Sequence, residues 1–410
     1  ASVPIIESVS SPDDHTVVFD MGDQPSNLIL PYLATTWISI VPKHILDKGP
    51  DELRDNAVGT GPFTIDWADK QRGIGYVRNP DYWGTDQEAR PLPYLDSMEL
   101  NTVKDSTQQL ALFRGGQIDV WPMWPAMEVS TAKAIKDQLG DAIYVDPIQL
   151  DAIVQMFMNT AAPPFDNPKV RKAAMYAMDR HEWVKRIYGT PYEGGGYPGY
   201  AFDPVLYKGY GLSAEEMLTF PGLDPSRRTA DVAQAKQLLA EAGYPDGVEL
   251  PAGVMTGQAG NYAQMAQVAA SLLRDAGFKT EAQVMEWGAF FSNLGEGQFQ
   301  IARNAWAGVV PDPLGMLSLT FGSWGASNNW TQWNNSEFDD LWIAASRTTD
   351  MVKKQEIVKQ IQRKVLSEDS SVINMVMATS NAPRWSYVKN FYPGPTPYGE
   401  HSYRHVWLER

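Results

Sequence analysis

The sequence contains no cysteine among its 410 residues. This absence excludes disulfides, thiolate catalysis and zinc sites built on cysteine, and it is compatible with a location outside the cytoplasm, where free thiols oxidise. No apolar run approaches the roughly 18 residues that a membrane-spanning helix needs. Basic residues are also in deficit, because 34 Lys and Arg stand against 49 Asp and Glu and give a net charge of −15. Such a surface repels phosphate backbones, so we expect no nucleic-acid partner.

The beginning of the chain lacks the basic region and apolar core of a secretory signal peptide. A mature, a processed and a truncated start all fit this beginning. The chain also lacks internal repeats, low-complexity tracts and a Pro/Ser-rich linker. We therefore expect that its domains, if there are two, are joined by strands rather than by a flexible tether.

Aromatic residues, in contrast, are abundant, with 14 Trp, 18 Tyr and 14 Phe. For any single tryptophan, filling the core is the ordinary explanation. So many in one acidic chain also favour a ligand cleft lined by aromatic rings. Both interpretations stay open at this point.

Hydrophobic spacing and turn residues predict a mixture of helices and strands. The expected strands lie at residues 15–19, 59–65 (after a turn), 75–80, 118–120, 280–285, 299–305, 372–377 and 401–407. The expected helices lie at residues 106–113, 167–178, 231–242, 261–276, 336–345 and 351–366. In the second half, helices are followed by strands, and this alternation implies an α/β lobe with a partly parallel sheet.

Motifs for catalysis or cofactor binding are weak. Gly59 and Gly61 precede a strand and lack the third glycine of a dinucleotide fingerprint. Ser130 and Lys133 match a Ser-x-x-Lys pattern, but its companion motifs are absent. His401 and His405 stand in turn-rich sequence, where a helical metal pair is not expected. We therefore predict no enzyme activity, no metal site and no cofactor.

Short segments in one order along nearly the whole chain resemble a known family. They are VGTGPF at 58–63, RNPDYWG at 78–84, PYLD at 93–96, FRGGQID at 113–119, NT at 159–160, PFDN at 164–167, VRKA at 170–173, AMDR at 177–180, AKQLLAEAGY at 235–244, WAG at 306–308 and PDP at 311–313. Together they resemble the family 5 extracytoplasmic solute-binding proteins of ABC importers, which carry peptides, nickel and some oligosaccharides. Members of that family have a longer N-terminal segment, so the resemblance implies that this chain is N-terminally truncated.

The resemblance implies a two-lobed α/β fold of the periplasmic-binding-protein type (type II, cluster C-like), with a cleft between the lobes. We expect a first lobe at residues 1–150, incomplete at its N-terminus and completed by 380–410, and a second at 151–379. The crossings near 150–158 and 376–384 would act as the hinge. A hinged receptor of this kind encloses its ligand by closing around it.

One departure from the family bears on the solute. The peptide-binding branch places an aspartate directly after Trp-x-Gly, where it pairs with the α-ammonium of the peptide, and Val309 stands there in this chain. A buried ammonium without an anionic partner is costly. The nearby Asp312 is retained, and it either contacts the ligand or only caps the chain beside Pro313.

Tryptophans gather in the part of the sequence that the resemblance assigns to the cleft. We expect Trp306 and Trp287 to line the cleft with Trp330 and Trp333 behind them, and Tyr197 to contribute from a glycine-rich loop. Aromatic rings suit sugar faces, and the amides of Asn328, Asn329, Gln332 and Asn334 suit sugar hydroxyls. The sequence thus leaves oligopeptide and oligosaccharide ligands both open.

The expected function is a monomeric receptor, periplasmic or otherwise extracytoplasmic and associated with the membrane. It would capture a small-molecule solute and deliver it to an ABC permease. Two alternatives stay open. One is a carbohydrate-active hydrolase that uses cleft carboxylates. The other is a chemosensory or chaperone-like binding protein whose partner is not a permease.

Overall fold

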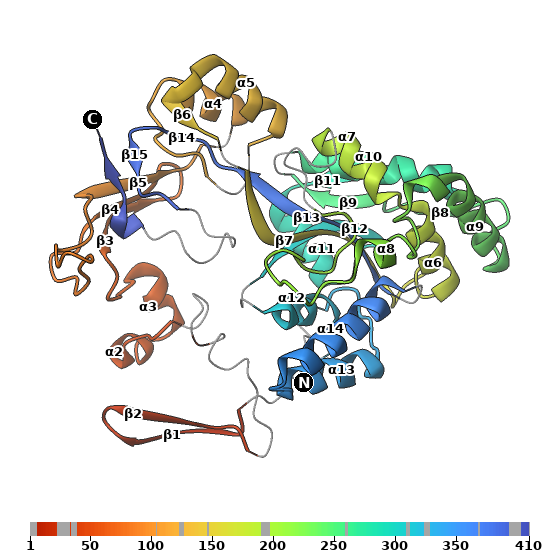
Figure 1. The fold of residues 1–410 in the computed structure, drawn as a ribbon, viewed down its shortest axis with the longest axis horizontal. Coiled ribbons are helices and arrows are strands. Elements are labelled where there is room, and N and C mark those ends of the chain that lie inside the picture. The colour runs from red at the N-terminus through yellow and green to blue at the C-terminus, as the bar shows by residue number, and fades with distance from the viewer. Residues whose placement is uncertain are drawn as a thin grey trace. The chain divides into compact units, whose positions relative to one another are not determined.

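The computed structural model describes residues 6–22, 33, 39–103, 105–122, 127–145, 147–189, 197–258, 261–308, 312–323, 329–367, 370–392 and 403–409. The chain falls into two compact units. Unit 1 comprises Ala1–Thr35 and Gln149–Thr379, and unit 2 comprises Thr36–Ile148 and Ser380–Arg410. The two later passages between the units fall within long strands, β7 (Pro147–Met158) and β13 (Val372–Asn381) (Figure 1). The lobe boundaries expected above stay a prediction.

Unit 1 is built on a five-stranded sheet with the order β11-β9-β12-β7-β13. Its other members are β9 (Val254–Gly257), β11 (Ala282–Met285) and β12 (Ile301–Ala307). β12 runs antiparallel to β7 and parallel to β9, so the sheet is mixed. In β7, residues 150–158 are all buried, which is typical of a strand covered on both faces.

Helices cover both faces of this sheet. Ala302 of β12 belongs to the hydrophobic core that the sheet shares with α11, α12, α13 and α14. The next residue, Arg303, points to the opposite face and lies 3.6 Å from the ring centroid of Tyr262 on α10. The helices are α6 (Pro168–Ala177), α7 (Arg180–Tyr188), α8 (Ala214–Met217), α9 (Arg228–Glu241), α10 (Tyr262–Asp275), α11 (Trp287–Gly295), α12 (Pro313–Phe321), α13 (Ser336–Arg347) and α14 (Met351–Leu366).

Two smaller strand pairs lie outside the main sheet of unit 1. β8 (Val248–Glu249) and β10 (Phe278–Lys279) form a small parallel pair, and β1 (Ser8–Asp13) and β2 (Thr16–Asp20) form an exposed antiparallel hairpin.

Unit 2 has smaller sheets. Its main sheet is antiparallel, with β4 (Gly73–Arg78) between β3 (Phe63–Asp69) and β5 (Ser97–Asn101). The core around Phe113 and Ile143 includes Trp121 and Ile135. The remaining elements are α2 (Lys43–Leu46), α3 (Pro50–Asp55), α4 (Ser106–Arg114), α5 (Val129–Leu139), β6 (Ile143–Tyr144), β14 (Arg384–Trp385), β15 (Val388–Lys389) and β16 (Trp407–Leu408).

The six expected helices are present as α4, α6, α9, α10, α13 and α14, and side chains cap several of them. The Asn167 side chain accepts from the Lys169 backbone N–H at the start of α6, and Asp105 caps α4 in the same way through Gln108. Such side-chain acceptors satisfy N–H groups that the first turn leaves unpaired. The cap of α13 is Asn335, with Ser336 as the first helical residue.

Two expected strands were wrong in part. Of residues 118–120, only Val120 pairs, in an isolated bridge with Arg384. The Gln117 N–H instead closes the end of α4 by donating to the Leu112 carbonyl. Near the C-terminus, residues 401–402 of the expected strand lie outside the described residues, residues 403–405 form a 3-10 turn, and β16 pairs with β15.

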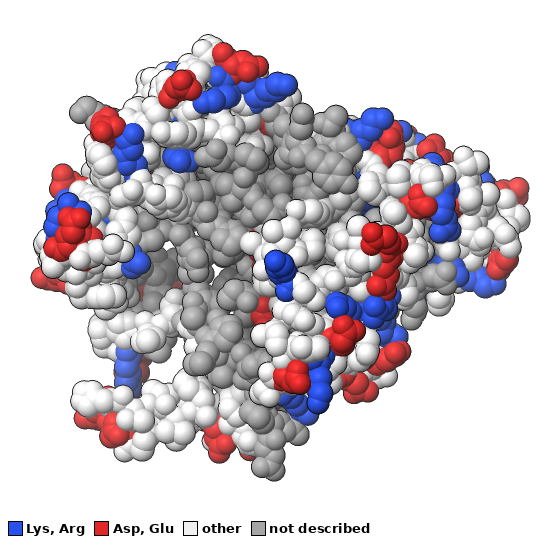
Figure 2. All heavy atoms as spheres, viewed as in Figure 1, with Lys and Arg blue, Asp and Glu red and all other residues white. Residues whose placement is uncertain are grey.

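The surface mixes both signs of charge. Figure 2 shows Lys and Arg side chains interspersed with Asp and Glu over the described surface on the face in view. Many of the exposed ion pairs are local, such as Lys43–Asp47 and Arg186–Glu182. Among the described residues, no helix is long and apolar enough to cross a membrane.

Candidate functional site

Aromatic rings from three elements of unit 1 meet at the end of β12. Trp306 stacks on Trp330 with ring centroids 5.0 Å apart and planes 24° apart. Trp330 also meets Phe291 of α11 at 5.6 Å, and Phe291 in turn meets Trp287 at 5.0 Å. Three of the predicted site residues, Trp287, Trp306 and Trp330, therefore belong to one aromatic cluster.

The other predicted aromatic residues lie elsewhere in the unit 1 core. Trp333 is buried against Phe321 of α12 and Phe338 of α13, where it fills space between helices. Tyr197 is partly buried, packs edge-on against Tyr200, and its carbonyl accepts from the Met377 N–H. Val309 lies outside the described residues.

Asp312 has two structural partners. Its carboxylate accepts from the Leu314 N–H at 2.9 Å and so caps α12. Its second oxygen receives the Lys354 ammonium of α14 at 2.6 Å, and both side chains are largely buried. The geometry therefore gives Asp312 a cap and an ion pair within unit 1.

An acid that the sequence analysis did not select stands beside the aromatic cluster. Asp151 lies near the start of β7, opposite Gly308, whose N–H donates to the Asp151 carbonyl at 2.6 Å. The side chain is only 5% exposed. A Cβ atom at residue 308 would collide with Asp151 Oδ2, so this close approach requires glycine at 308. Ile153, two residues further along β7, pairs with Trp306, which places Asp151 and Trp306 on the same face of the sheet.

The Asp151 carboxylate is only half satisfied. Tyr207 donates its hydroxyl to Asp151 Oδ2 at 2.6 Å, whereas Oδ1 is buried and receives no hydrogen bond from any described residue. Burial raises the pKa of Asp151 to about 6, the Tyr207 hydrogen bond opposes that rise, and the charge of Asp203 adds to it. Burial likewise raises the pKa of Tyr207, and the charge of Asp151 raises it further.

The Asp203 carboxylate likewise has one oxygen that accepts hydrogen bonds and one that does not. Its Oδ1 accepts from the Val205 and Leu206 N–H groups at 2.7 and 2.8 Å, whereas its buried Oδ2 has no donor. Burial raises its pKa as well. Trp306 Nε1 is a third buried polar atom without a hydrogen-bond partner. The region near the end of β12 thus contains two carboxylate oxygens and one indole N–H that have no hydrogen-bond partner among the described residues.

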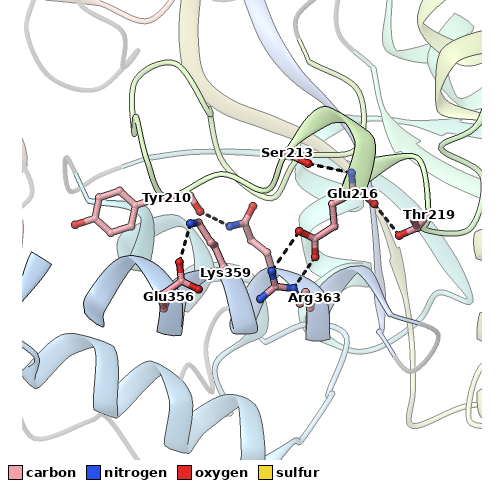
Figure 3. A network of polar contacts seen from close by, with 8 residues as sticks. Tyr210, Ser213, Glu216, Thr219, Glu356, Lys359 and Arg363 are labelled. Carbon is pink, nitrogen blue, oxygen red and sulfur yellow. Dashed lines mark hydrogen bonds and ion pairs between the residues drawn. The ribbon is translucent and has the colours of Figure 1, made fainter. Parts of the chain in front are cut away.

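Helix α14 anchors the segment that carries Asp203 and Tyr207. Further along that segment, the Tyr210 carbonyl accepts from Gln362 at 2.7 Å, and Glu216 of α8 forms a two-pronged ion pair with Arg363 at 2.6 and 3.2 Å (Figure 3). Since α14 also supplies Lys354 to Asp312, one helix positions both acidic parts of the site. Rigid support of this kind keeps a binding site close to its working geometry.

The chemical character of the site follows from the side chains that it brings together. Among the described residues, no group of three or more His, Asp or Glu side chains could hold a metal ion. What the site offers is aromatic surface beside uncompensated negative charge. The sequence does contain a signal for Asp151, since it is the one acid in the mostly apolar segment 147–158. The position of its partner Tyr207 is visible only in the fold.

Solved structures with the same fold are periplasmic binding proteins. The chain superposes with a TM-score of 0.82 on DppA from Helicobacter pylori, solved in complex with the peptide STSA, at 26% identity, covering 99% of this chain and 75% of that one. It superposes with a TM-score of 0.81 on Haemophilus influenzae OppA in complex with RPPGFSPFR, at 20% identity, covering 98% and 75%. The predicted class of fold, α/β and like the two-lobed periplasmic binding proteins, is thereby confirmed.

The family follows from the sequence match. Residues 2–328 match the model of the bacterial extracellular solute-binding proteins, family 5 Middle. The chain belongs to this family, as the resemblance predicted.

Named relatives in this family are binding proteins. The chain is 28% identical to heme-binding protein A of Haemophilus influenzae, over 96% of this chain and 69% of that protein. It is 25% identical to the dipeptide-binding protein of Escherichia coli K12, over 99% and 72%. It is 24% identical to the periplasmic oligopeptide-binding protein OppA of the same organism, over 89% and 64%. The chain thus spans about two thirds of the length of these relatives.

Proposed function

We propose that this chain is the solute receptor of an ABC importer and that its solute is a peptide. The observation that carries the proposal is the family match over residues 2–328, combined with relatives that are named as dipeptide-, oligopeptide- and heme-binding proteins. The receptor would work outside the cytoplasm, as a monomer, and would deliver the peptide to a membrane permease. Capture would need no bond to be made or broken, in keeping with relatives that are named for binding.

The site supports a peptide better than an oligosaccharide. The sugar hypothesis depended on open tryptophan faces and unoccupied amides. Trp306 and Trp330 instead stack on one another, and the Asn329 amide donates to the Trp333 carbonyl at 2.8 Å. A buried carboxylate beside Trp306 suits a solute with a positive charge, which peptides carry and neutral sugars lack.

Ligand-induced stabilisation tests this proposal. Purified protein is heated with a pool of tri- to pentapeptides and, separately, with a pool of neutral oligosaccharides. A ligand that binds only the folded state at 100 times its Kd stabilises it by about 2.7 kcal/mol, which raises the melting temperature measurably. We expect peptides to raise it and sugars to leave it unchanged. A rise with sugars alone would overturn the proposal.

Single variants then locate the site. Trp306→Ala should weaken binding of the best peptide from the pool at least tenfold, as measured by calorimetric titration, because it removes the indole that lies on the same face of the sheet as Asp151. Trp83→Ala is the matched control, since Trp83 is 75% exposed in unit 2. Unchanged affinity of Trp306→Ala would remove Trp306 from the site.

A further inference from the structure

We propose that Asp151, with Asp203 beside it, binds an ammonium group of the solute. The inference rests on the proposed function and deepens it, because it names the chemical group that the receptor recognises. It also assigns to β7 a role that Val309 cannot perform, since valine carries no charge.

The first observation is that the protein leaves both acids half satisfied. Each carboxylate has one oxygen that accepts from the chain, Tyr207 for Asp151 and two backbone N–H groups for Asp203. The other oxygen of each is buried without a donor. A buried anion in this condition is costly unless a cation or hydrogen-bond donors compensate it.

The second observation is that the two acids influence one another. The charge of Asp203 raises the pKa of Asp151, so the two carboxylates repel one another. A water molecule could donate hydrogen bonds, but it would leave this repulsion in place. A primary ammonium carries three donors and one positive charge, so it would donate to the open oxygen of Asp151 and also offset the excess negative charge.

A lysine of unit 1, Lys354, is paired with an acid other than Asp151 and Asp203. Lys354 is held by Asp312 at 2.6 Å, and neither Asp151 nor Asp203 forms an ion pair with a described residue. Besides burial, the charges of Asp151, Asp203 and Asp312 all raise the pKa of the Tyr207 hydroxyl, so the surroundings of Asp151 are acidic. A solute cation would therefore meet a negative field in which no described lysine or arginine forms an ion pair with Asp151 or Asp203.

The third observation is the aromatic neighbour. Trp306 lies on the same face as Asp151 and one strand away, and its Nε1 is also without an acceptor. Ammonium groups bind favourably over indole rings, and a peptide carbonyl next to the ammonium could accept from the indole N–H. An N-terminal residue, with its ammonium and its first carbonyl adjacent, carries both groups.

The experiment compares peptides that differ only in this charge. Wild-type protein is mixed with a tetrapeptide library that has free amino termini and with the same library N-acetylated, and the bound masses are read by native mass spectrometry. We expect at least tenfold enrichment of the free-amine peptides, and Asp151→Asn should reduce that preference to about one. Asp231→Asn is the matched control, because Asp231 is a buried acid of α9 that shares no partner with Asp151; it should keep the preference.

A third library, N-acetylated but with one lysine in each peptide, separates the two sources of an ammonium. Binding that depends on Asp151 in this library would support the ammonium site and assign it to a side chain. Equal binding of free and acetylated peptides by wild-type protein would overturn the inference and leave the proposed function standing. Binding of none of the libraries would overturn both.

A measurement on wild-type protein alone guards against a variant that fails to fold. Since the empty Asp151 has a pKa of about 6, lowering the pH through 6 protonates it and removes the charge that attracts the ammonium. The preference for free-amine peptides should therefore fall by about tenfold per pH unit below 6. A preference that stays constant from pH 7.5 to 5 would contradict the role of Asp151.

Discussion

The two units differ in how far they bury their apolar and charged side chains. In unit 1, β7 is buried over residues 150–158, and the core includes Phe157 and Trp342 at 2% and 1% exposure. In unit 2, the three-stranded sheet exposes apolar side chains, among them Ile65 at 49% and Leu100 at 45%. A side chain stabilises a fold only to the extent that folding removes it from water. The sheet of unit 1 therefore holds more of its strand residues out of water than the sheet of unit 2 does.

Charges follow the same division. Unit 1 buries the Asp312–Lys354 pair and the Asp151 carboxylate, whereas in unit 2 the pair between Arg72, in the turn before β4, and Glu99 of β5 is 61% and 49% exposed. Exposed pairs contribute little, and buried charges contribute or cost a great deal according to their partners. The comparison directs the search for functional charge to the buried carboxylates of unit 1, because a buried charge has a larger energetic consequence than an exposed one.

The sharpest test of the comparison is Phe157→Ala in β7. Phe157 packs in the unit 1 core and meets the ring of Trp330 at 6.2 Å. Truncating a buried phenylalanine costs about 3–5 kcal/mol, because it leaves a cavity as well as removing apolar contact. The free energy of unfolding in urea, followed by tryptophan fluorescence, measures this loss. A loss below about 1 kcal/mol would show that unit 1 is not packed as described.

The next effect concerns the buried ion pair. Lys354→Ala leaves Asp312 buried without its cation, so we expect a loss of about 3 kcal/mol or more in the free energy of unfolding. Arg72→Ala, which breaks the exposed pair of unit 2, should change it by less than about 1 kcal/mol. Urea denaturation of both variants under identical conditions makes the comparison. Similar losses would remove the contrast between the units.

Asp151→Asn should change the free energy of unfolding in the opposite direction, by raising it. Burial raises the pKa of Asp151 from 3.8 to about 6, so the folded state holds its proton more tightly than the unfolded state. The stability contributed by this group therefore falls as pH rises from about 4 to 6, and the ionised carboxylate costs about 3 kcal/mol at pH 7.5. Neutral asparagine avoids that cost.

We expect Asp151→Asn to raise the free energy of unfolding of the ligand-free protein by up to about 3 kcal/mol at pH 7.5 and by only about 1 kcal/mol at pH 4.5. Urea denaturation at both pH values measures the two differences. If Asp151→Asn stabilises the fold and also abolishes peptide binding, then the Asp151 charge serves binding and not stability. A loss of stability at pH 7.5 would mean that the protein itself compensates the carboxylate.

The smallest effect is expected for Leu100→Ala in β5. Leu100 is 45% exposed, so its truncation removes only part of the transfer free energy of a leucine, and we expect a loss of about 1 kcal/mol or less. Amide hydrogen exchange read by peptide mass spectrometry assigns the loss to unit 2, because exchange reports the local opening of each segment. A loss comparable to that of Phe157→Ala would mean that this face of the sheet is covered.

Local signals predicted much of the secondary structure. Asn167 followed by Pro168 fixed the start of α6, and the apolar spacing from Met351 to Leu366 gave α14 at its observed bounds. Strands were harder, and residues 118–120 show why. Their apolar pattern fits a strand, but pairing depends on a distant partner, and only Arg384 is placed to bridge Val120. A helix satisfies its own backbone, whereas a strand requires another segment.

The same distinction separates the residues of the candidate site. Sequence alone selected Trp287, Trp306 and Trp330, because composition and the family pattern both pointed to that region. It ranked Asp312 as a ligand residue, and the fold gives Asp312 a helix cap and a lysine partner. Asp312 and Lys354 are 42 residues apart, too far for any local pattern to pair them.

By itself the sequence determined the family, the α/β class and six of the helices, because these depend on motifs and on neighbours within a few residues along the chain. Only the tertiary structure decided which acid is left uncompensated. Asp151 meets Tyr207 from 56 positions away and lies against Gly308 at the far end of the neighbouring strand. Whether a carboxylate is satisfied or bare depends on every group that surrounds it in space, and that set is fixed only when the sheet and its helices have assembled.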